Sequence, residues 1–427
     1  MGGSGIAVVP LEGRKNRFPT KVALARGHRE HAPCCDLSPF DQDLLVSANF
    51  EGFLLVQRIP EGGLKSDLTS FEHRISTGGK VHRAQFHPYV HNVIVASVSR
   101  PDGSFIVGFW SLETGELEKE IEFFEGIVED FSFHSNCKLM ATSCKDGKIR
   151  IIDVQQNSVV KTFACREAQR DTQVLFASES RLLTIGFGER SRRSFSIWDF
   201  AGEGKAQELD YHSFPVSNGS LIPHFDVDNN LFYVAHFGSV SLDVFQLYPQ
   251  EPYYETLQNL TLNSDIRGMA FTHKTNVDTK KVEIARCLRV NQKTIVPVTW
   301  TLPRRRKQFF QDDLYSTTLS PDPIFRAQAF FDWDGDKVEG KQVSLRPPGM
   351  ELLSNAPEEE LTGRQKKYLN HIKEMEAPND EEKAAEERLS NVLADTADYT
   401  TVGNRWDAKP ANCSDVDDDE WGSDVSD

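Results

Sequence analysis

A stretch in the middle of the chain, EDFSFHSNCKLMATSCKDGKIRIIDVQ, alternates apolar and polar residues in short runs separated by turn residues. Alternation with a period of two, bounded by Ser-Asn and Asp-Gly, is typical of antiparallel strands joined by tight turns. Gly147 suits such a turn because glycine adopts positive φ without steric cost. The pattern therefore predicts a meander of three strands: Asp130–His134, Lys138–Cys144 and Lys148–Val154.

Similar stretches recur upstream, ending at Trp110, and downstream, ending at Trp198-Asp199. A sheet unit of roughly 40–45 residues that ends in a hydrophobic-Asp pair is typical of a WD-type propeller blade. We therefore predict an all-β, WD-type β-propeller, with the two tryptophans as packing residues. The corresponding positions, 42 to 53 residues apart, are Gln57, Trp110, Ile152, Trp198 and Phe245.

Length and charge narrow the possible functions. The 427 residues suffice for one large propeller plus an appendage. The net charge is −16, and most of it lies in residues 356–427, which hold 20 acidic and 8 basic side chains. Because the remainder is close to neutral, we expect no nucleic-acid partner.

Other sequence features argue against several chemistries. Seven cysteines without a repeated spacing predict reduced thiols in a cytoplasmic protein. We find no phosphate loop, no G-x-S-x-G and no H-E-x-x-H, so we expect no enzyme, no cofactor and no small-molecule substrate. An enzyme would need a perturbed titratable cluster in the central channel, and we expect none. We expect Asp102, Asp146 and Asp199 to fix turns.

A zinc site formed by His28, His31, Cys34 and Cys35 is a possibility that we set aside. His28 belongs to a Gly-His turn. Cys34 and Cys35 begin a strand, so their side chains point to opposite faces of a sheet. We therefore expect no metal.

The ordered motifs VPL, GH, IPEGGL, CKDGKIRIID, SIWD, IPHFDVDNNLFYVA and FQDDLY resemble those of the coronin family, over about residues 5 to 346. LPRRRKQFFQDDLY, VSLRPPGM and DDDEW are most similar to the carboxy-terminal half of the long, tandem coronins. The resemblance implies a seven-bladed propeller that binds actin filaments. It also implies a carboxy-terminal extension, FQDDLY to VSLRPP, packed on one face of the ring.

The resemblance also suggests how the chain is divided. We expect a WD-repeat propeller over 1–303, an extension packed on it over 304–350, and an acidic, partly helical or disordered tail over 351–427. A coronin normally begins with a basic strand that closes the last blade and two inner strands of the first blade. Here Met1 lies almost directly before GIAVVPL. We therefore expect an incomplete amino-terminal seam with exposed strand edges, as in a fragment, an alternative start or half of a larger gene product.

Two segments are candidate partner-binding sites. The acidic run Asp417, Asp418, Asp419, Glu420 with Trp421 resembles the motif by which nucleation promoters engage the actin-related-protein (Arp) nucleating complex. Carboxylates steer toward a basic groove and the indole anchors in a pocket; the alternative is a solubilising tail.

The basic run Arg304, Arg305, Arg306, Lys307 suits an acidic actin surface or an anionic membrane; the alternative is a solvated loop paired with Asp312 and Asp313. Arg190, Arg192 and Arg193 form a similar loop.

The function predicted from these features is that of a coronin-like actin-cytoskeleton adaptor in the cytoplasm and cytoskeleton. The propeller would bind actin filaments and the tail would bind the Arp nucleating complex. The alternative function is a scaffold for Golgi or membrane trafficking or for ubiquitin-linked assembly, located at the Golgi or the cell cortex.

Overall fold

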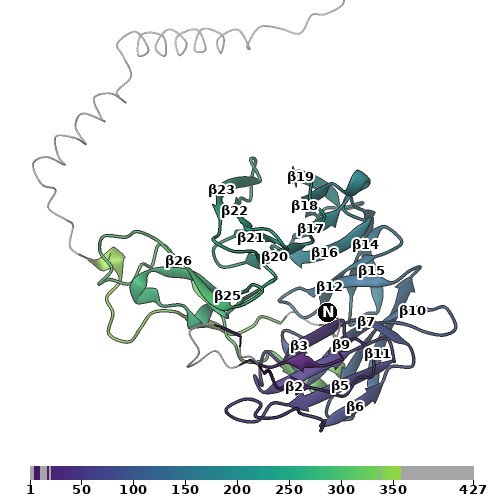
Figure 1. The fold of residues 1–427 in the computed structure, drawn as a ribbon. Coiled ribbons are helices and arrows are strands. Elements are labelled where there is room, and N and C mark those ends of the chain that lie inside the picture. The colour runs from purple at the N-terminus through teal and green to yellow at the C-terminus, as the bar shows by residue number, and fades with distance from the viewer. Residues whose placement is uncertain (1–3, 10–16, 19–20, 336–337, 357–427) are drawn as a thin grey trace, which may run out of the picture. The chain divides into compact units, whose positions relative to one another are not determined.

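The computed structural model describes residues 4–9, 17–18, 21–335 and 338–356. Residues 1–356 form one compact unit. Within the described ranges the protein is built almost wholly of antiparallel sheets that follow one another along the chain (Figure 1). In five four-stranded sheets and one three-stranded sheet, neighbouring strands are consecutive in sequence, except that the short strand β8 is skipped in the second.

The strands of the first three sheets are, in order, β3 (Cys34–Leu37), β4 (Leu44–Ala48), β5 (Phe53–Arg58) and β6 (His73–Ser76); β7 (Lys80–Phe86), β9 (Val93–Ser99), β10 (Phe105–Ser111) and β11 (Leu117–Phe124); and β12 (Val128–Phe133), β13 (Leu139–Cys144), β14 (Lys148–Asp153) and β15 (Ser158–Ala164). Those of the next three are β16 (Arg170–Phe176), β17 (Arg181–Phe187), β18 (Arg193–Asp199) and β19 (Gln207–Ser213); β20 (Leu221–Asp226), β21 (Leu231–His236), β22 (Ser241–Leu247) and β23 (Tyr254–Thr261); and β24 (Gly268–Phe271), β25 (Glu283–Val290) and β26 (Ile295–Thr301).

Shorter elements complete the fold. They are β1 (Ile6–Ala7), β2 (Leu24–Ala25), β8 (Val90–His91), β27 (Thr317–Leu319), β28 (Phe325–Arg326), β29 (Gln342–Ser344), the helix α1 (Ala327–Phe331) and the 3-10 turns η1 (Glu189–Ser191), η2 (Lys274–Asn276), η3 (Thr279–Lys281) and η4 (Leu353–Asn355).

The predicted meander is confirmed in β12, β13 and β14. Met140 pairs with Phe133 on one side and with Ile152 on the other. Gly147 has φ +80° in the turn and donates its N–H to the Cys144 carbonyl at 3.0 Å. The predicted turn role of Asp102, Asp146 and Asp199 is also confirmed, because each carboxylate accepts a backbone N–H two residues along, at 2.8 to 2.9 Å.

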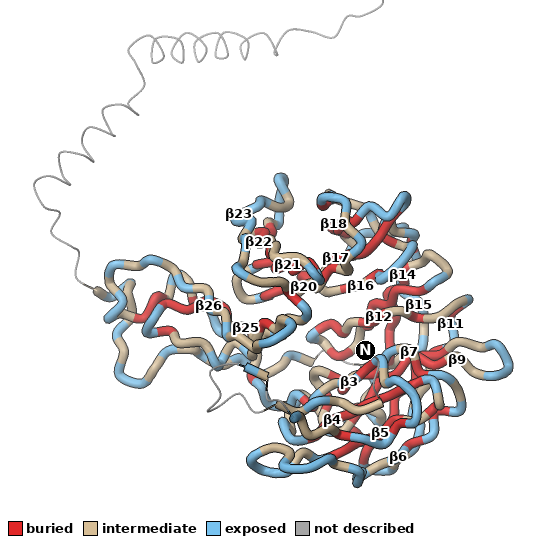
Figure 2. The backbone as a smooth tube through the Cα atoms, in the orientation of Figure 1, coloured by how far each residue is buried: buried red, intermediate tan, exposed pale blue. Residues whose placement is uncertain are grey.

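The core lies between successive sheets. Buried residues are concentrated on the middle strands of the sheets, such as β4, β9, β13 and β17 (Figure 2). One apolar cluster joins the first two sheets through Val56, Ile94 and Trp110, and another joins the fourth and fifth through Phe195, Phe232 and Phe245. In several neighbouring sheets the first strands lie against each other, as with β3 and β7 or β12 and β16. This radial stacking of sheets is that of a propeller.

The first and last sheets are linked by the amino-terminal segment. Strands β1 and β2 pair in register Ile6↔Ala25. Ala25 makes a parallel bridge to Leu68 beside the first sheet, and Arg17 bridges Thr294 in the turn before β26. Six sheets with this hairpin between the last and the first form an incomplete seven-bladed propeller, so the predicted fold class is confirmed.

Residues 304–356 cross the end of the sheets at which the first strands finish. The Tyr315 hydroxyl donates to the Glu283 carbonyl at 2.8 Å, and the Asn229 amide donates to the Leu314 carbonyl at 3.1 Å. Farther along, β28 pairs in parallel with β8, and Phe330 of α1 is buried in the cluster shared by the second and third sheets. The segment thereby ties sheets on different sides of the ring together.

Candidate functional site

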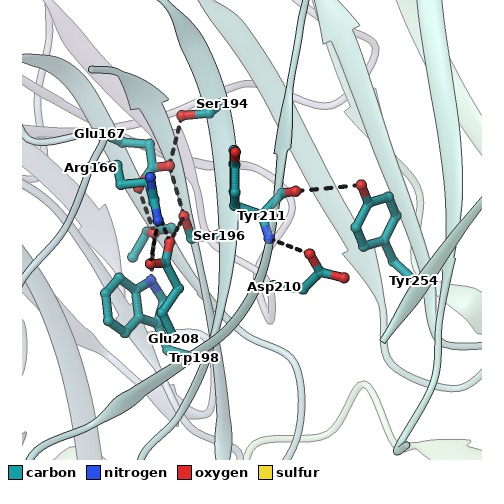
Figure 3. A network of polar contacts seen from close by, with 10 residues as sticks. Arg166, Glu167, Ser194, Ser196, Trp198, Glu208, Asp210, Tyr211 and Tyr254 are labelled. Carbon is teal, nitrogen blue, oxygen red and sulfur yellow. Dashed lines mark hydrogen bonds and ion pairs between the residues drawn. The ribbon is translucent and has the colours of Figure 1, made fainter. Parts of the chain in front are cut away.

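A buried polar network fixes the fourth sheet (Figure 3). The Trp198 indole N–H donates to Thr184 Oγ1 at 2.9 Å, and Thr184 donates to Glu167 Oε2 at 3.0 Å. Ser194 and Ser196 donate to Glu167 Oε1 at 2.8 and 2.9 Å. Burial raises the pKa of the Glu167 carboxyl above its usual range. All of its partners are internal, so the network holds strands together, and the predicted packing role of Trp198 is confirmed.

In the first sheet Gln57 occupies the position that tryptophan has in the fourth. Its amide nitrogen donates to the carbonyls of Arg26 and Ser70, each at 3.0 Å. These bonds tie the segment after β2 to the first sheet. A polar residue is accommodated here because its hydrogen-bonding groups are paired with backbone carbonyls.

The residues set aside as zinc ligands make other contacts. His28 lies 2.9 Å from Ser47 Oγ, and burial lowers the pKa of its imidazole. Cys34 is buried and Cys35 is exposed, as expected for neighbours on a strand. Across the ranges that the structure describes, no three His, Cys, Asp or Glu side chains are grouped so as to hold a metal ion.

The three arginines in the loop before β18 have two different environments. Arg193 is buried and donates to the carbonyls of Pro215 at 2.7 Å and Gly219 at 3.2 Å. Arg190 and Arg192 are exposed at η1. Arg193 therefore anchors the loop between β19 and β20, and only the other two arginines face solvent.

The basic run 304–307 begins directly after the last sheet. Arg304 pairs with Asp313 at 2.8 Å, and the Arg306 guanidinium lies 4.9 Å from the centre of the Phe309 ring. Arg305 and Lys307 are exposed. For Arg304, the pairing with Asp313 agrees with the alternative prediction, in which the basic run is a solvated loop that pairs with acidic residues. Asp312 instead accepts the Ser354 N–H at 3.1 Å.

The acidic run with Trp421 and residues 357–427 of the predicted tail lie outside the described residues. That candidate site therefore stays a prediction.

A cavity that the sequence did not reveal lies at the end of the sheets where the first strands begin, opposite residues 304–356. It has a volume of about 440 Å³. Its walls come from β7, β12, β16 and β20, the loops that lead into them, and the turn between β13 and β14. The lining residues are His82, Arg83, Ile127, Glu129, Asp130, Lys145, Asp171, Thr172, Gln173, Ser220, Leu221 and Ile222.

Carboxylates with perturbed titration line this cavity. Burial raises the pKa of both Glu129 and Asp130. The expectation of no perturbed titratable cluster in the central channel is therefore wrong. Glu129 and Asp130 are the second and third residues of β12, and the neighbouring innermost strands desolvate them. Each accepts a backbone N–H from β16, Glu129 from Thr172 at 3.4 Å and Asp130 from Val174 at 3.2 Å. The carboxylates thus also join two sheets.

Comparisons with known proteins agree with this geometry. Residues 295–333 match a family described as a type of WD40 repeat, and residues 100–188 match the WD40 domain of anaphase-promoting complex subunit 4. Coronin-A of Dictyostelium discoideum is 30% identical over 347 residues, which cover 81% of this chain and 75% of that protein. The chain belongs to the coronin family.

The predicted family is thus confirmed, and longer coronins match as well. Coronin-7 of Mus musculus is 29% identical over 391 residues, 90% of this chain and 40% of that protein. Coronin-7 of Bos taurus is 30% identical over 429 residues, 98% of this chain and 44% of that protein. The chain spans about two fifths of the length of these relatives, in keeping with the predicted similarity to the long coronins.

A solved coronin structure supports the fold. The WD40 domain from Toxoplasma gondii coronin aligns with a TM-score of 0.67 at 23% identity, covering 76% of this chain and 83% of that one. As a member of the coronin family, this chain is a non-enzymatic WD40 scaffold. We therefore infer a structural or binding role for the cavity carboxylates of this coronin. In its described residues no helix is long and apolar enough to cross a membrane.

Proposed function

We propose that this coronin is an actin-cytoskeleton adaptor of the cytoplasm, with filaments bound by the propeller and the Arp nucleating complex bound by Asp417–Trp421. The family supports an actin-related partner. The observation that carries the filament contact is the pair of exposed cations, Arg305 and Lys307, in the segment that crosses one end of the ring. Basic side chains on a body that is otherwise near neutral provide electrostatic attraction to an acidic surface.

The support for the second contact lies in the sequence of the tail. Four consecutive carboxylates steer the segment toward a basic groove, and Trp421 supplies a large apolar anchor. The tail also contains Trp406, which lies next to a single acidic residue, Asp407, rather than after a run of four. This second tryptophan provides a matched control.

The test is a pull-down of purified Arp complex by the full chain and by two single variants. We expect Trp421→Ala to reduce recovery at least about tenfold, because truncating an aromatic anchor costs about 2 kcal/mol or more. Trp406→Ala should recover as much complex as the unsubstituted chain. Equal recovery by both variants would refute the docking role of Trp421.

The trafficking scaffold remains the second candidate, because Arg305 and Lys307 also suit an anionic membrane surface. Co-sedimentation with vesicles that contain phosphatidylserine separates the two functions. Binding to vesicles without binding to filaments would favour the scaffold.

A further inference from the structure

The cavity between β7, β12, β16 and β20 takes no part in the proposed function. Its volume of about 440 Å³ lies within the range of small ligand pockets. Residues 304–356 cover the opposite end of the ring, so they do not fill it. Its walls combine carboxylates with the apolar side chains Ile127, Leu221 and Ile222.

The carboxylates of the cavity are only loosely paired with cations. Asp130 lies 3.3 Å from Arg83, Asp171 lies 3.7 Å from Arg170, and Glu129 lies 3.9 Å from Lys145. Charge-assisted hydrogen bonds are usually about 2.7–2.9 Å long. Elsewhere in this protein the Arg166–Glu208 and Arg58–Glu72 pairs are both 2.6 Å long.

In two of these three pairs the carboxylate and the cation also differ in exposure. The Asp130 and Glu129 side chains are 10% and 18% exposed, whereas those of Arg83 and Lys145 are 45% and 56% exposed. Asp130 and Glu129 are therefore held in the wall, and their cations lie toward solvent. Asp171 is 42% exposed and lies at the rim, where its carboxylate accepts the Ser220 hydroxyl at 2.6 Å. Since an ionised carboxylate accepts up to about four hydrogen bonds, these groups retain acceptor capacity for another cation.

Exposed aromatic rings flank the cavity. Phe50 is 46% exposed, and its ring centre lies 5.6 Å from that of the lining residue His82. On another side Phe237 is 41% exposed, and its backbone N–H donates to the carbonyl of the lining residue Ser220 at 2.9 Å. The Arg267 guanidinium lies 5.6 Å from the centre of the Phe237 ring. A guanidinium group stacks well on aromatic faces and binds carboxylates with two parallel hydrogen bonds.

We propose that this cavity binds an arginine side chain on an extended segment of a partner protein, with the guanidinium on Glu129 and Asp171 and the flanking residues on Phe50 and Phe237. Charge complementarity selects the cation, because the fixed wall groups are acidic. The apolar part of the wall accommodates the methylene groups of the arginine side chain. Lys145 then competes with the arginine for Glu129. This site is separate from Arg305, Lys307 and the acidic tail.

The test uses the full chain and a pool of short, blocked, fluorescein-labelled peptides with a central arginine among Ala, Ser, Leu and Phe. A second pool carries citrulline, which has the shape of arginine without its charge. The tightest member of the arginine pool, selected by fluorescence anisotropy, becomes the probe. Its citrulline counterpart should bind at least about tenfold more weakly.

Substitutions in the cavity test whether the probe peptide binds there. The double variant Glu129→Gln, Asp171→Asn should bind the probe peptide at least about tenfold more weakly. Lys145→Met should bind it more tightly, because the competing cation is gone. The control is Glu189→Gln, an exposed carboxylate in the loop before β18, which should change nothing. Circular dichroism and thermal melting establish that each variant is folded.

Three results would overturn the inference. They are equal binding of the arginine and citrulline peptides, unchanged binding by the double variant, and weaker binding by Lys145→Met. A carbodiimide cross-link from Glu129 or Asp171 to a lysine of residues 357–427 in the same chain would assign the cavity to the protein's own tail and overturn the partner. The assay contains neither actin nor the Arp complex, so its outcome is independent of the proposed function.

Discussion

Phe330 is the apolar anchor that holds residues 304–356 against the sheets. It is carried by α1 and is 0% exposed. Its ring centre lies 5.3 Å from that of His87 and 6.4 Å from that of Phe109, and its carbonyl accepts the Gln155 amide at 3.2 Å. The adjoining strand β28 pairs with β8 over only two residues. Phe330 is the large fully buried side chain of α1, and the smaller Ala327 and the partly buried Phe325, Phe331 and Trp333 pack in the same cluster.

Replacing Phe330 by alanine should cost about 3–5 kcal/mol, the usual range for truncating a buried phenylalanine. That amount should favour local detachment of α1 and β28 by about 100-fold or more, since about 1.4 kcal/mol changes an equilibrium constant tenfold. The sheets should stay folded, because the core between the fourth and fifth sheets contains no residue of this segment.

Hydrogen–deuterium exchange with mass spectrometry measures this directly. We expect peptides that cover 325–331 and 90–91 to exchange at least about 100-fold faster in Phe330→Ala, with peptides from β21 and β22 unchanged. Gln328→Ala, an exposed position on the same helix, is the control and should leave the exchange rates unchanged. Unaltered exchange around 325–331, or equal acceleration in every sheet, would contradict the anchoring role.

Three further predictions concern the sheets themselves. Trp198→Phe should lower the free energy of unfolding in urea by about 1–3 kcal/mol, because the Thr184 hydroxyl loses its indole donor; no loss would argue against the network. Gly79→Ala should destabilise by about 1–3 kcal/mol, because a Cβ there would lie 2.3 Å from the Ser99 carbonyl oxygen, whereas Gly202→Ala, with open space around it, should be neutral. Burial raises the pKa of Asp130, so the folded state binds its proton more tightly, and stability from this group falls as pH rises from the ordinary carboxyl range through the raised pKa. Asp130→Asn should flatten that part of the curve of unfolding free energy against pH, and an unchanged slope would contradict this account.

The sequence predicted those parts of the fold that alternate strongly. Strands β12, β13 and β14 lie within a residue or two of their predicted bounds. Nearly every residue of β13 and β14 is buried, and β12 mixes buried with half-buried positions. Outer strands such as β15 escaped prediction. Only Phe163 is buried along β15, so it shows little contrast between apolar and polar positions.

One of the corresponding positions in the blades was missed because its spacing in the sequence differs from that of the others. Trp300 lies in β26, the third strand of the last sheet, and corresponds to Phe245 in β22. The 3-10 turns η2 and η3 lengthen the connection between β24 and β25, which places Trp300 beyond the spacing of the earlier repeats. Trp300 fits the repeat pattern if a longer separation between successive blades is allowed.

The candidate site was less predictable than the fold. Arg190, Arg192 and Arg193 look alike in sequence, yet only Arg193 is buried, because it is the first residue of β18. The cavity residues come from four strands that lie far apart in sequence, and only the folded ring brings them together. The adjacent acidic pair Glu129 and Asp130 at the start of a predicted innermost strand was the available signal.

The most direct test of the adaptor function is co-sedimentation of the full chain with actin filaments at low and moderate salt. The account predicts salt-sensitive binding that falls at least about tenfold in the double variant Arg305→Glu, Lys307→Glu. Lys65→Glu with Lys205→Glu, a charge-matched change at two exposed lysines elsewhere, should bind as the unsubstituted chain does. Filament binding that is absent, or equal in all three proteins, would contradict the central claim.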